Sequence, residues 1–288
     1  MDKMVKLYSG SLLKGGNNIM ENLCLLSIED SIKSRYSVRN YDKNKIISKE
    51  ILDNIEEYVE ALENPFGVRV RVRLVKKEKY DGVVKLGTYG VISGAKYYLV
   101  AACEKKDFAY EALGYTFEKA ILYCTSLGLN SIWLGLTFNK SAFEKTINLK
   151  ENEILPIVAP IGYEGGEKTF IASFFKSHRN NRIEFNKLFF DKDFNNKLIK
   201  NNDIYSKALE MVRYAPSSVN SQPWRIVKNK ENFHIYATNK SKMNRIDIGI
   251  ALCHLDLYLQ ENGIDGRFDF DNPSLNTKYN YIITWKRR

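Results

Sequence analysis

The sequence predicts an α+β fold in which amphipathic helices and short strands follow one another along 288 residues. The strand prediction rests on residues 68–74, where valine and leucine alternate with arginine, and on the apolar run 96–103. The helix prediction rests on residues 48–62, which carry an apolar stripe, and on the almost wholly apolar stretch 108–127. No apolar run reaches the roughly 18 residues of a membrane span, so we expect no membrane partner.

Capping residues predict where the first two helices begin. Ser27 precedes Glu29 and Asp30 in the pattern of a capping box, so a short helix should start there. Ser48 should cap the next helix, because Glu50 in its first turn favours a helix N-terminus. The later elements that we expect are a strand over 131–136, a helix over 139–147, a strand over 154–163, a helix over 203–214, a strand over 225–228, a hairpin near 229–231, a helix over 247–260 and a strand over 279–285.

A polar loop, Ala215-Pro-Ser-Ser-Val-Asn-Ser-Gln-Pro-Trp224, follows the predicted helix 203–214. Pro216 cannot continue a helix, so the chain must leave the helical pattern there. The hydroxyl and amide side chains of the loop can present several neutral hydrogen-bonding groups to a flat ligand with polar edges. Taken residue by residue, the loop is equally an ordinary turn rich in asparagine, serine and proline.

A second polar cluster, Arg35-Tyr-Ser-Val-Arg39, lies near the N-terminus. In extended backbone, alternate side chains point the same way, so Arg35, Ser37 and Arg39 should share one face. Two guanidinium groups with a hydroxyl between them suit a phosphate or the carbonyl-rich edge of a ring. Without a second signal, this cluster could also be a solvated basic edge.

The two clusters together resemble the signatures of the nitroreductase-like flavoenzymes, which bind FMN between two subunits. The loop matches their Pro-Ser-Ser-x-Asn-x-Gln-Pro-Trp motif, and residues 35–39 match their Arg-x-Ser-x-Arg motif. Ordinary members carry the two motifs one helix apart, whereas residues 63–67 stand at that place here and the loop comes far downstream. The resemblance therefore implies a nitroreductase-like fold of two related halves in one chain, an intramolecular pseudo-dimer that keeps one FMN site at the junction of its halves.

This organisation implies a division of the chain into four parts. Residues 1–21 form an extension, 22–190 the first nitroreductase-like half, 191–202 a polar connector and 203–288 a shorter second half. We expect Met20 to be the native start, since Lys14-Gly15-Gly16 can be encoded by a ribosome-binding sequence a short distance upstream.

The resemblance also implies the residues that bind FMN. The turn at Leu134 and Gly135 matches the segment that family members place near the reactive nitrogen of the flavin, and glycine permits a close backbone approach. The basic stretch with Arg179 and Arg182 matches the segment that reaches the FMN phosphate. The complete set of implied FMN-binding residues is Arg35, Ser37, Arg39, Leu134, Gly135, Arg179, Arg182, Pro216, Ser217, Ser218, Asn220 and Gln222.

The implied activity is an FMN-dependent reductase that uses NADH or NADPH to reduce a nitroaromatic, a quinone or a similar small acceptor. The sequence has no glycine-rich dinucleotide fingerprint, so the nicotinamide donor would dock on the flavin and leave before the acceptor enters. The residue pattern identifies no general acid. Two alternatives stay open: a flavin-binding protein with little turnover, and a basic nucleic-acid-binding or membrane-surface protein.

Charge and composition bear on nucleic-acid binding, the cellular compartment and metal binding. The formal charge is +10, but the lysines are spread along the chain rather than gathered in a stripe, so we expect no nucleic-acid partner. The four cysteines lie scattered in apolar segments, which is typical of free thiols in a reducing cytosol, and we expect a cytoplasmic protein. The three histidines are also scattered, so no metal site is expected.

Overall fold

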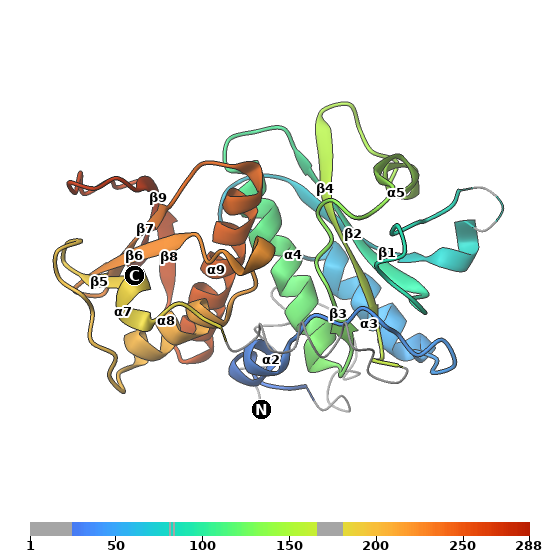
Figure 1. Ribbon diagram of the computed structural model, residues 1–288, viewed down its shortest axis with the longest axis horizontal. Helices are drawn as coiled ribbons and strands as arrows, with labels where there is room; N and C mark the ends of the chain where they lie inside the picture. Colours follow the sequence, from blue (N-terminus) through green and yellow to red (C-terminus); the bar gives the residue numbers. More distant parts are fainter. Residues whose placement is uncertain (1–24, 81, 83, 166–180) are drawn as a thin grey trace. The chain divides into compact units, whose positions relative to one another are not determined.

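Figure 1 shows the computed structural model, which describes residues 25–80, 82, 84–165 and 181–288. The predicted extension 1–21, Met20 and Arg179 lie outside the described residues. Contacts divide the chain into two compact units. Among the described residues, the first unit holds the chain up to Glu63, Val68–Ala109 and the stretch from Thr116 to residue 165, and the second holds Asn64–Gly67, Tyr110–Tyr115 and Asn181–Arg288.

The first unit is built on an antiparallel sheet in the order β1-β2-β4-β3. These strands are β1 (Val70–Lys76), β2 (Tyr97–Glu104), β3 (Asn130–Ser131) and β4 (Glu153–Gly162). In β2, residues 97–103 are all buried, as the apolar run predicts for a strand that has neighbours on both sides. The edge strand β1 is less buried: Val72 and Val75 are buried, Arg73 is exposed and its other four residues are half-buried.

The helices of the first unit begin where the capping residues predict. The Ser27 side chain accepts the N–H of Asp30 at the start of α2 (Ile28–Ser34), and Ser48 accepts the N–H of Ile51 at the start of α3 (Lys49–Glu60). The others are η2 (Lys77–Tyr80), α4 (Ala109–Ser126) and α5 (Lys140–Thr146), which Asn139 caps. Residues 110–115 of α4 cluster with the second unit.

The second unit contains a five-stranded sheet in the order β5-β6-β7-β9-β8 (Figure 1). Its helices α8 (Ile204–Tyr214) and α9 (Lys242–Glu261) pack against each other, and α9 also packs on β7. The smaller elements are α7 (Phe185–Leu188) and η4 (Ser218–Asn220). The strands are β5 (Phe189–Asp191), β6 (Trp224–Asn229), β7 (Asn232–Ala237), β8 (Gly266–Asp269) and β9 (Asn280–Arg287).

The two units repeat one topology, which confirms the predicted pair of related halves. In each, a helix (α3 or α8) precedes two paired strands, a long helix (α4 or α9) follows, and two more strands complete the sheet. The order β1-β2-β4-β3 corresponds strand for strand to β6-β7-β9-β8. The second sheet differs by the added strand β5, which pairs in parallel with β6.

Some element boundaries differ from the predicted ones for local reasons. The predicted strand 131–136 is reduced to β3 and a bridge between Leu134 and Val158, because residues 132 and 133 leave the strand and the chain bends after Leu134. Helix α9 begins before the predicted residue 247, since the Ser241 side chain caps it by accepting the N–H of Asn244. The short elements β5, α7 and β8 were not predicted.

The described residues contain neither a candidate membrane-spanning helix nor a candidate metal-binding cluster. None of the helices there has the length and apolar character needed to cross a membrane. No group of three or more histidine, cysteine, aspartate or glutamate side chains in the same ranges could hold a metal ion. Cys103, Cys124 and Cys253 are buried, and burial raises the pKa of both Cys103 and Cys124 to about 12.

Candidate functional site

The loop that follows α8 has an unusual backbone. Val219, Asn220 and Gln222 have φ angles of 47°, 57° and 46°, in the left-handed region that residues other than glycine seldom occupy. For the β-branched Val219, the conformation is an outlier, and its side chain is 96% exposed. Each such residue costs of the order of 1–3 kcal/mol, so the surrounding contacts must hold the loop in this shape.

Hydrogen bonds inside the loop supply part of that restraint. The Ser217 Oγ accepts the backbone N–H of Gln222 at 2.9 Å, and the Ser217 carbonyl accepts the N–H of Asn220 at 3.0 Å. The N–H of Ser221 donates to the carbonyl of Ser218 at 3.0 Å. Pro223 then leads into β6, where Trp224 is fully buried, so the exit of the loop is anchored in the core.

Arg182, which precedes α7 in the chain, restrains the loop through hydrogen bonds. Its guanidinium donates to the carbonyl oxygens of Tyr214 and Ala215 at 2.9 and 2.8 Å and to Oδ1 of Asn220 at 3.1 Å. These bonds satisfy carbonyls at the end of α8 that no helical N–H can reach. The predicted residue Arg182 thus contacts the signature loop itself, and its contact with a phosphate stays a prediction.

Two further side chains tie the loop to the same segment. The Asn220 Nδ2 donates to the Asn181 carbonyl at 2.8 Å, and the Gln222 Oε1 accepts the N–H of Ile183 at 3.0 Å. Gln222 is 1% exposed, whereas Asn220 is half-buried. Of the predicted residues, Arg182, Ser217, Asn220 and Gln222 therefore form one hydrogen-bonded cluster in the second unit.

Asp247 on α9 also belongs to this cluster, although the sequence analysis did not select it. Both of its carboxylate oxygens accept the backbone N–H of Ser218 at 3.1 Å, and the residue is 4% exposed. Burial raises the pKa of Asp247 to about 7, and the hydrogen bond from Ser218 partly opposes that shift. The signal that could have revealed it is a carboxylate between Ile246 and Ile248, in a helix that is otherwise apolar there.

The predicted residues of the first unit lie on an extended segment that continues from α2. Ser37 forms a parallel bridge with Ser131, and the N–H of Val38 donates to the Ser131 carbonyl at 3.0 Å. Val38 is 3% exposed whereas Ser37 is exposed, which is the alternation that the sequence predicts. Burial lowers the pKa of the half-buried Arg39, so an anionic partner would favour its charged form.

The turn at Leu134 and Gly135 is held by the neighbouring strand β4. The N–H of Leu134 donates to the Val158 carbonyl at 2.9 Å, and the N–H of Val158 donates back at 3.1 Å. Before the turn, the indole N–H of Trp133 donates to Oε2 of the buried Glu118 at 3.0 Å. Because the Leu134 amide is engaged, Gly135 is the better placed of the two for a close backbone contact with a ligand.

The described site residues thus fall into two groups, one in each unit. Arg35, Ser37, Arg39, Leu134 and Gly135 belong to the first unit. The second unit holds Arg182, Pro216, Ser217, Ser218, Asn220 and Gln222. Each group has its own local restraints, and the loop in the second unit is the more densely bonded.

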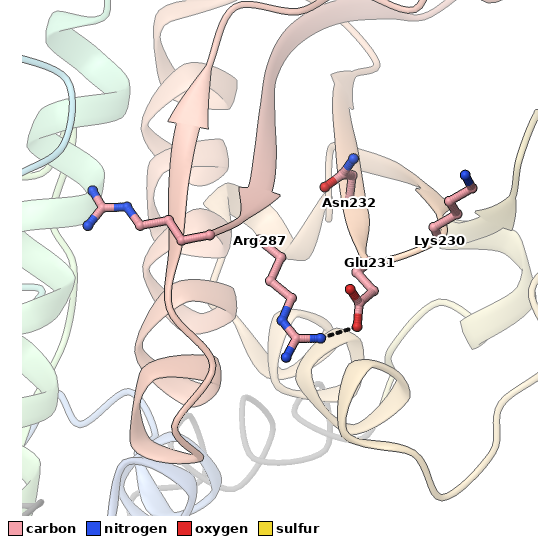
Figure 2. Close-up of a pocket in the computed structure, with 5 residues that line it drawn as sticks. Lys230, Glu231, Asn232 and Arg287 are labelled. Atoms are coloured by element: carbon pink, nitrogen blue, oxygen red, sulfur yellow. Dashed lines mark hydrogen bonds and ion pairs between the residues drawn. The ribbon is translucent and has the colours of Figure 1, made fainter.

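A surface pocket of about 430 Å³ also lies in the second unit, lined by Lys230–Asn232 at the β6–β7 turn and by Arg287 and Arg288. Figure 2 shows that Arg287 and Glu231 point toward each other and form an ion pair, while Lys230 points away from them. The Glu231 carboxylate also accepts the Tyr205 hydroxyl at 2.8 Å. The charges of Arg287 and Glu231 neutralise each other, so this pocket is less suited to bind an anionic ligand than the loop cluster is.

The fold is that of the nitroreductases. A protein from Thermotoga maritima described as a "putative nitroreductase" superposes with a TM-score of 0.62 at 18% identity, covering 95% of this chain and 98% of that one. The chain belongs to the family described as "Putative TM nitroreductase", whose model matches residues 27–258.

Other solved structures superpose with lower TM-scores. A nitroreductase family protein from Clostridium difficile 630 is 20% identical and covers 57% of this chain and 96% of its own, with a TM-score of 0.43. An FMN-dependent nitroreductase from Clostridium difficile R20291 is 22% identical and covers 52% of this chain and 98% of its own, with a TM-score of 0.39. No curated protein matches the sequence.

Proposed function

We propose that the protein is an FMN-dependent oxidoreductase that takes electrons from NADH or NADPH and passes them to a nitroaromatic, a quinone or a similar small acceptor. Membership of the nitroreductase family supports an oxidoreductase, and one structural relative is itself an FMN-dependent nitroreductase. The observation that carries the proposal is the signature loop, a strained segment restrained from Arg182, Ile183 and Asp247. Restraint of this kind is what a preorganised binding site requires.

The residue chemistry of both groups fits FMN. Exposed or half-buried hydroxyl and amide groups on the loop, among them Ser217, Ser218 and Asn220, can bond the polar edge of the ring or the ribityl chain. Arg35 and Arg39 can supply positive charge for the phosphate or for the pyrimidine edge, and Arg39 gains from an anion because it is partly desolvated. When bound, FMN supplies the electron transfer, and the protein binds and orients it.

One flavin per chain follows from this assignment. Each unit supplies only one of the two family signatures, so we propose that the chain binds one FMN. The chain would then act alone as a pseudo-dimer, with a small-molecule acceptor as its partner and the cytoplasm as its compartment.

The absorbance spectrum of the purified protein tests the proposal directly. We expect a flavin spectrum after FMN is added and unbound FMN is removed, and loss of that absorbance when NADH or NADPH is added without oxygen. Reoxidation by a quinone or a nitroaromatic would complete the cycle. A protein that retains no FMN is not a flavoenzyme, and one that retains FMN but is not bleached by either nicotinamide is a flavin-binding protein without this turnover.

A further inference from the structure

Asp247 occupies a position where a carboxylate is energetically costly. It lies near the start of α9, is 4% exposed, and has Ile246 and Ile248, which are 2% and 0% exposed, as chain neighbours. Its two oxygens both face one donor, the backbone N–H of Ser218. A buried carboxylate is costly to ionise unless it accepts hydrogen bonds, and at Asp247 the backbone N–H of Ser218 supplies one.

Ser218 is the residue at which the loop enters its strained conformation. The next two residues, Val219 and Asn220, both have positive φ angles, and Asn220 is a predicted FMN contact. Arg182 and Ile183 restrain the two flanks of the loop through Ala215, Asn220 and Gln222. Asp247 restrains its middle, and it does so from a long helix rather than from another loop.

We propose that Asp247 is a positioning residue whose ionised carboxylate holds the Ser217–Gln222 loop in its FMN-binding conformation, so that FMN binds more tightly above neutral pH than below it. The inference rests on the proposed function. A carboxylate accepts an N–H more strongly than a protonated carboxyl group does, because the bond is charge-assisted. Protonation of Asp247 therefore weakens the restraint at Ser218, and by reciprocity FMN favours the ionised form.

A pH-dependence of the loop restraint must be separated from the titration of the other groups around Asp247. At the helical positions three and four residues away, α9 carries the uncharged Met243, Asn244, Ile250 and Ala251. The titratable side chains on the elements packed against α9 and beside the loop include Tyr110, Glu111 and Tyr115 of α4, Tyr205, Lys207, Glu210, Arg213 and Tyr214 of α8, His234 and Tyr236 of β7, and Arg182, while α9 itself carries Arg245 two residues before Asp247.

Several of these groups are already engaged. Glu111 pairs with Arg245 at 2.7 Å, and Glu210 pairs with Arg213 at 2.7 Å. His234 contacts Thr284, and Arg182 donates to the loop. In agreement with the geometry, burial brings the pKa of Asp247 to about 7, within the range where an enzyme normally works.

The test is the FMN dissociation constant of the wild type and of Asp247→Asn, measured by quenching of flavin fluorescence from about pH 6 to about pH 8.5. Asparagine keeps the size and one acceptor oxygen but cannot ionise. We expect wild-type affinity to rise about three- to tenfold more over this range than the affinity of the variant. The FMN phosphate also titrates near pH 6, and it does so for both proteins. The ratio of the two FMN dissociation constants at each pH therefore isolates the effect of Asp247.

Asp256→Asn is the matched control, because Asp256 is an equally buried carboxylate on α9 that bonds Tyr115 and Trp285 rather than the loop. It should retain the wild-type pH dependence. If Asp247→Asn does not fold, the carboxyl group of Asp247 can be titrated in the wild type by ¹³C NMR, and bound FMN should lower its pKa. FMN binding with equal pH dependence in wild type and variant, or a carboxyl pKa unmoved by FMN, would overturn this inference alone. No FMN binding at any pH would overturn the proposed function as well.

Discussion

Gly114 of α4 and Gly249 of α9 meet where these two helices cross. A Cβ atom at Gly114 would stand 2.1 Å from the Ile246 carbonyl oxygen, and one at Gly249 would stand 2.1 Å from the Glu111 carbonyl oxygen. Each glycine therefore contacts the residue three positions before the other, which is the reciprocal pattern of a two-fold contact between like helices. The crossing supports the origin of α4 and α9 as equivalent helices of two related halves.

Gly114→Ala should destabilise the protein by about 2 kcal/mol. Alanine gains up to about 1 kcal/mol of helix propensity, but the new methyl group meets a backbone carbonyl that cannot rotate away, and overpacking costs about 1–3 kcal/mol or more. Denaturant unfolding measures the difference. Gly87→Ala is the control, since its Cβ would find only the Lys85 carbonyl oxygen at 3.9 Å. Equal stability of both variants would show that the helices do not cross this closely.

Asp247→Asn should be more stable than the wild type at about pH 8, and the difference should shrink at about pH 5. The folded pKa of about 7 lies above the ordinary aspartate pKa of 3.8, so the folded state binds the proton more tightly than the unfolded state. Wild-type stability from this group is therefore present at low pH and is lost as pH rises through about 7, by up to about 4 kcal/mol.

Chemical denaturation of both proteins at the two pH values measures this dependence. Other carboxylates act in the opposite direction, because pairing lowers the pKa of Glu153 and Glu210 in the folded state. The difference between wild type and variant removes their contribution, since both proteins contain them. A stability difference that is the same at both pH values would mean that Asp247 does not titrate in this range.

Much of the local structure was predictable because the signals are short in range. The caps at Ser27 and Ser48 depend on three or four neighbouring residues. The loop after Tyr214 is recognisable from its own amino-acid sequence. The contact of Asp247 with Ser218 was not predictable, because it joins two residues far apart in the chain. The strand β5 was missed for the same reason, since only its pairing with β6 makes Phe189–Asp191 a strand.

The role of Arg182 shows a second limit of sequence reasoning. The contact with phosphate that the resemblance implies stays a prediction, and the guanidinium also donates to Tyr214, Ala215 and Asn220, which the sequence did not reveal. The same residue type serves an anion or a set of carbonyl oxygens, and only the folded loop reveals which acceptors lie within reach.

Asn220→Ala and Arg35→Ala should each weaken FMN binding by about tenfold or more. Loss of a hydrogen bond costs about 0.5–1.5 kcal/mol, and loss of one from a charged group costs about 1.5–3 kcal/mol. Asn220 also stabilises the loop through Arg182 and Asn181, so its removal should act on both binding and loop order.

Fluorescence titration with FMN measures both effects. Asn229→Ala and Arg69→Ala are matched controls, since both residues are exposed and neither belongs to the two groups of predicted site residues. Unchanged affinity in both test variants would mean that the cofactor binds elsewhere. A loss of FMN affinity in Asn220→Ala but not in Arg35→Ala would mean that the loop contacts FMN and that Arg35 does not.

The chain should bind one FMN, although its two halves share a topology. The connection between α3 and β1 corresponds to the loop between α8 and β6, but it carries Glu63-Asn-Pro-Phe-Gly67 in place of the serine, asparagine and glutamine side chains. Phe66 instead packs its ring against Tyr115 and Phe268 at 5.8 and 5.5 Å, so this segment contributes to packing. The ratio of flavin absorbance to protein concentration at saturating FMN measures the stoichiometry, and we expect a value near one. Two flavins per chain would mean that the segment 63–67 has kept a binding function without its polar side chains.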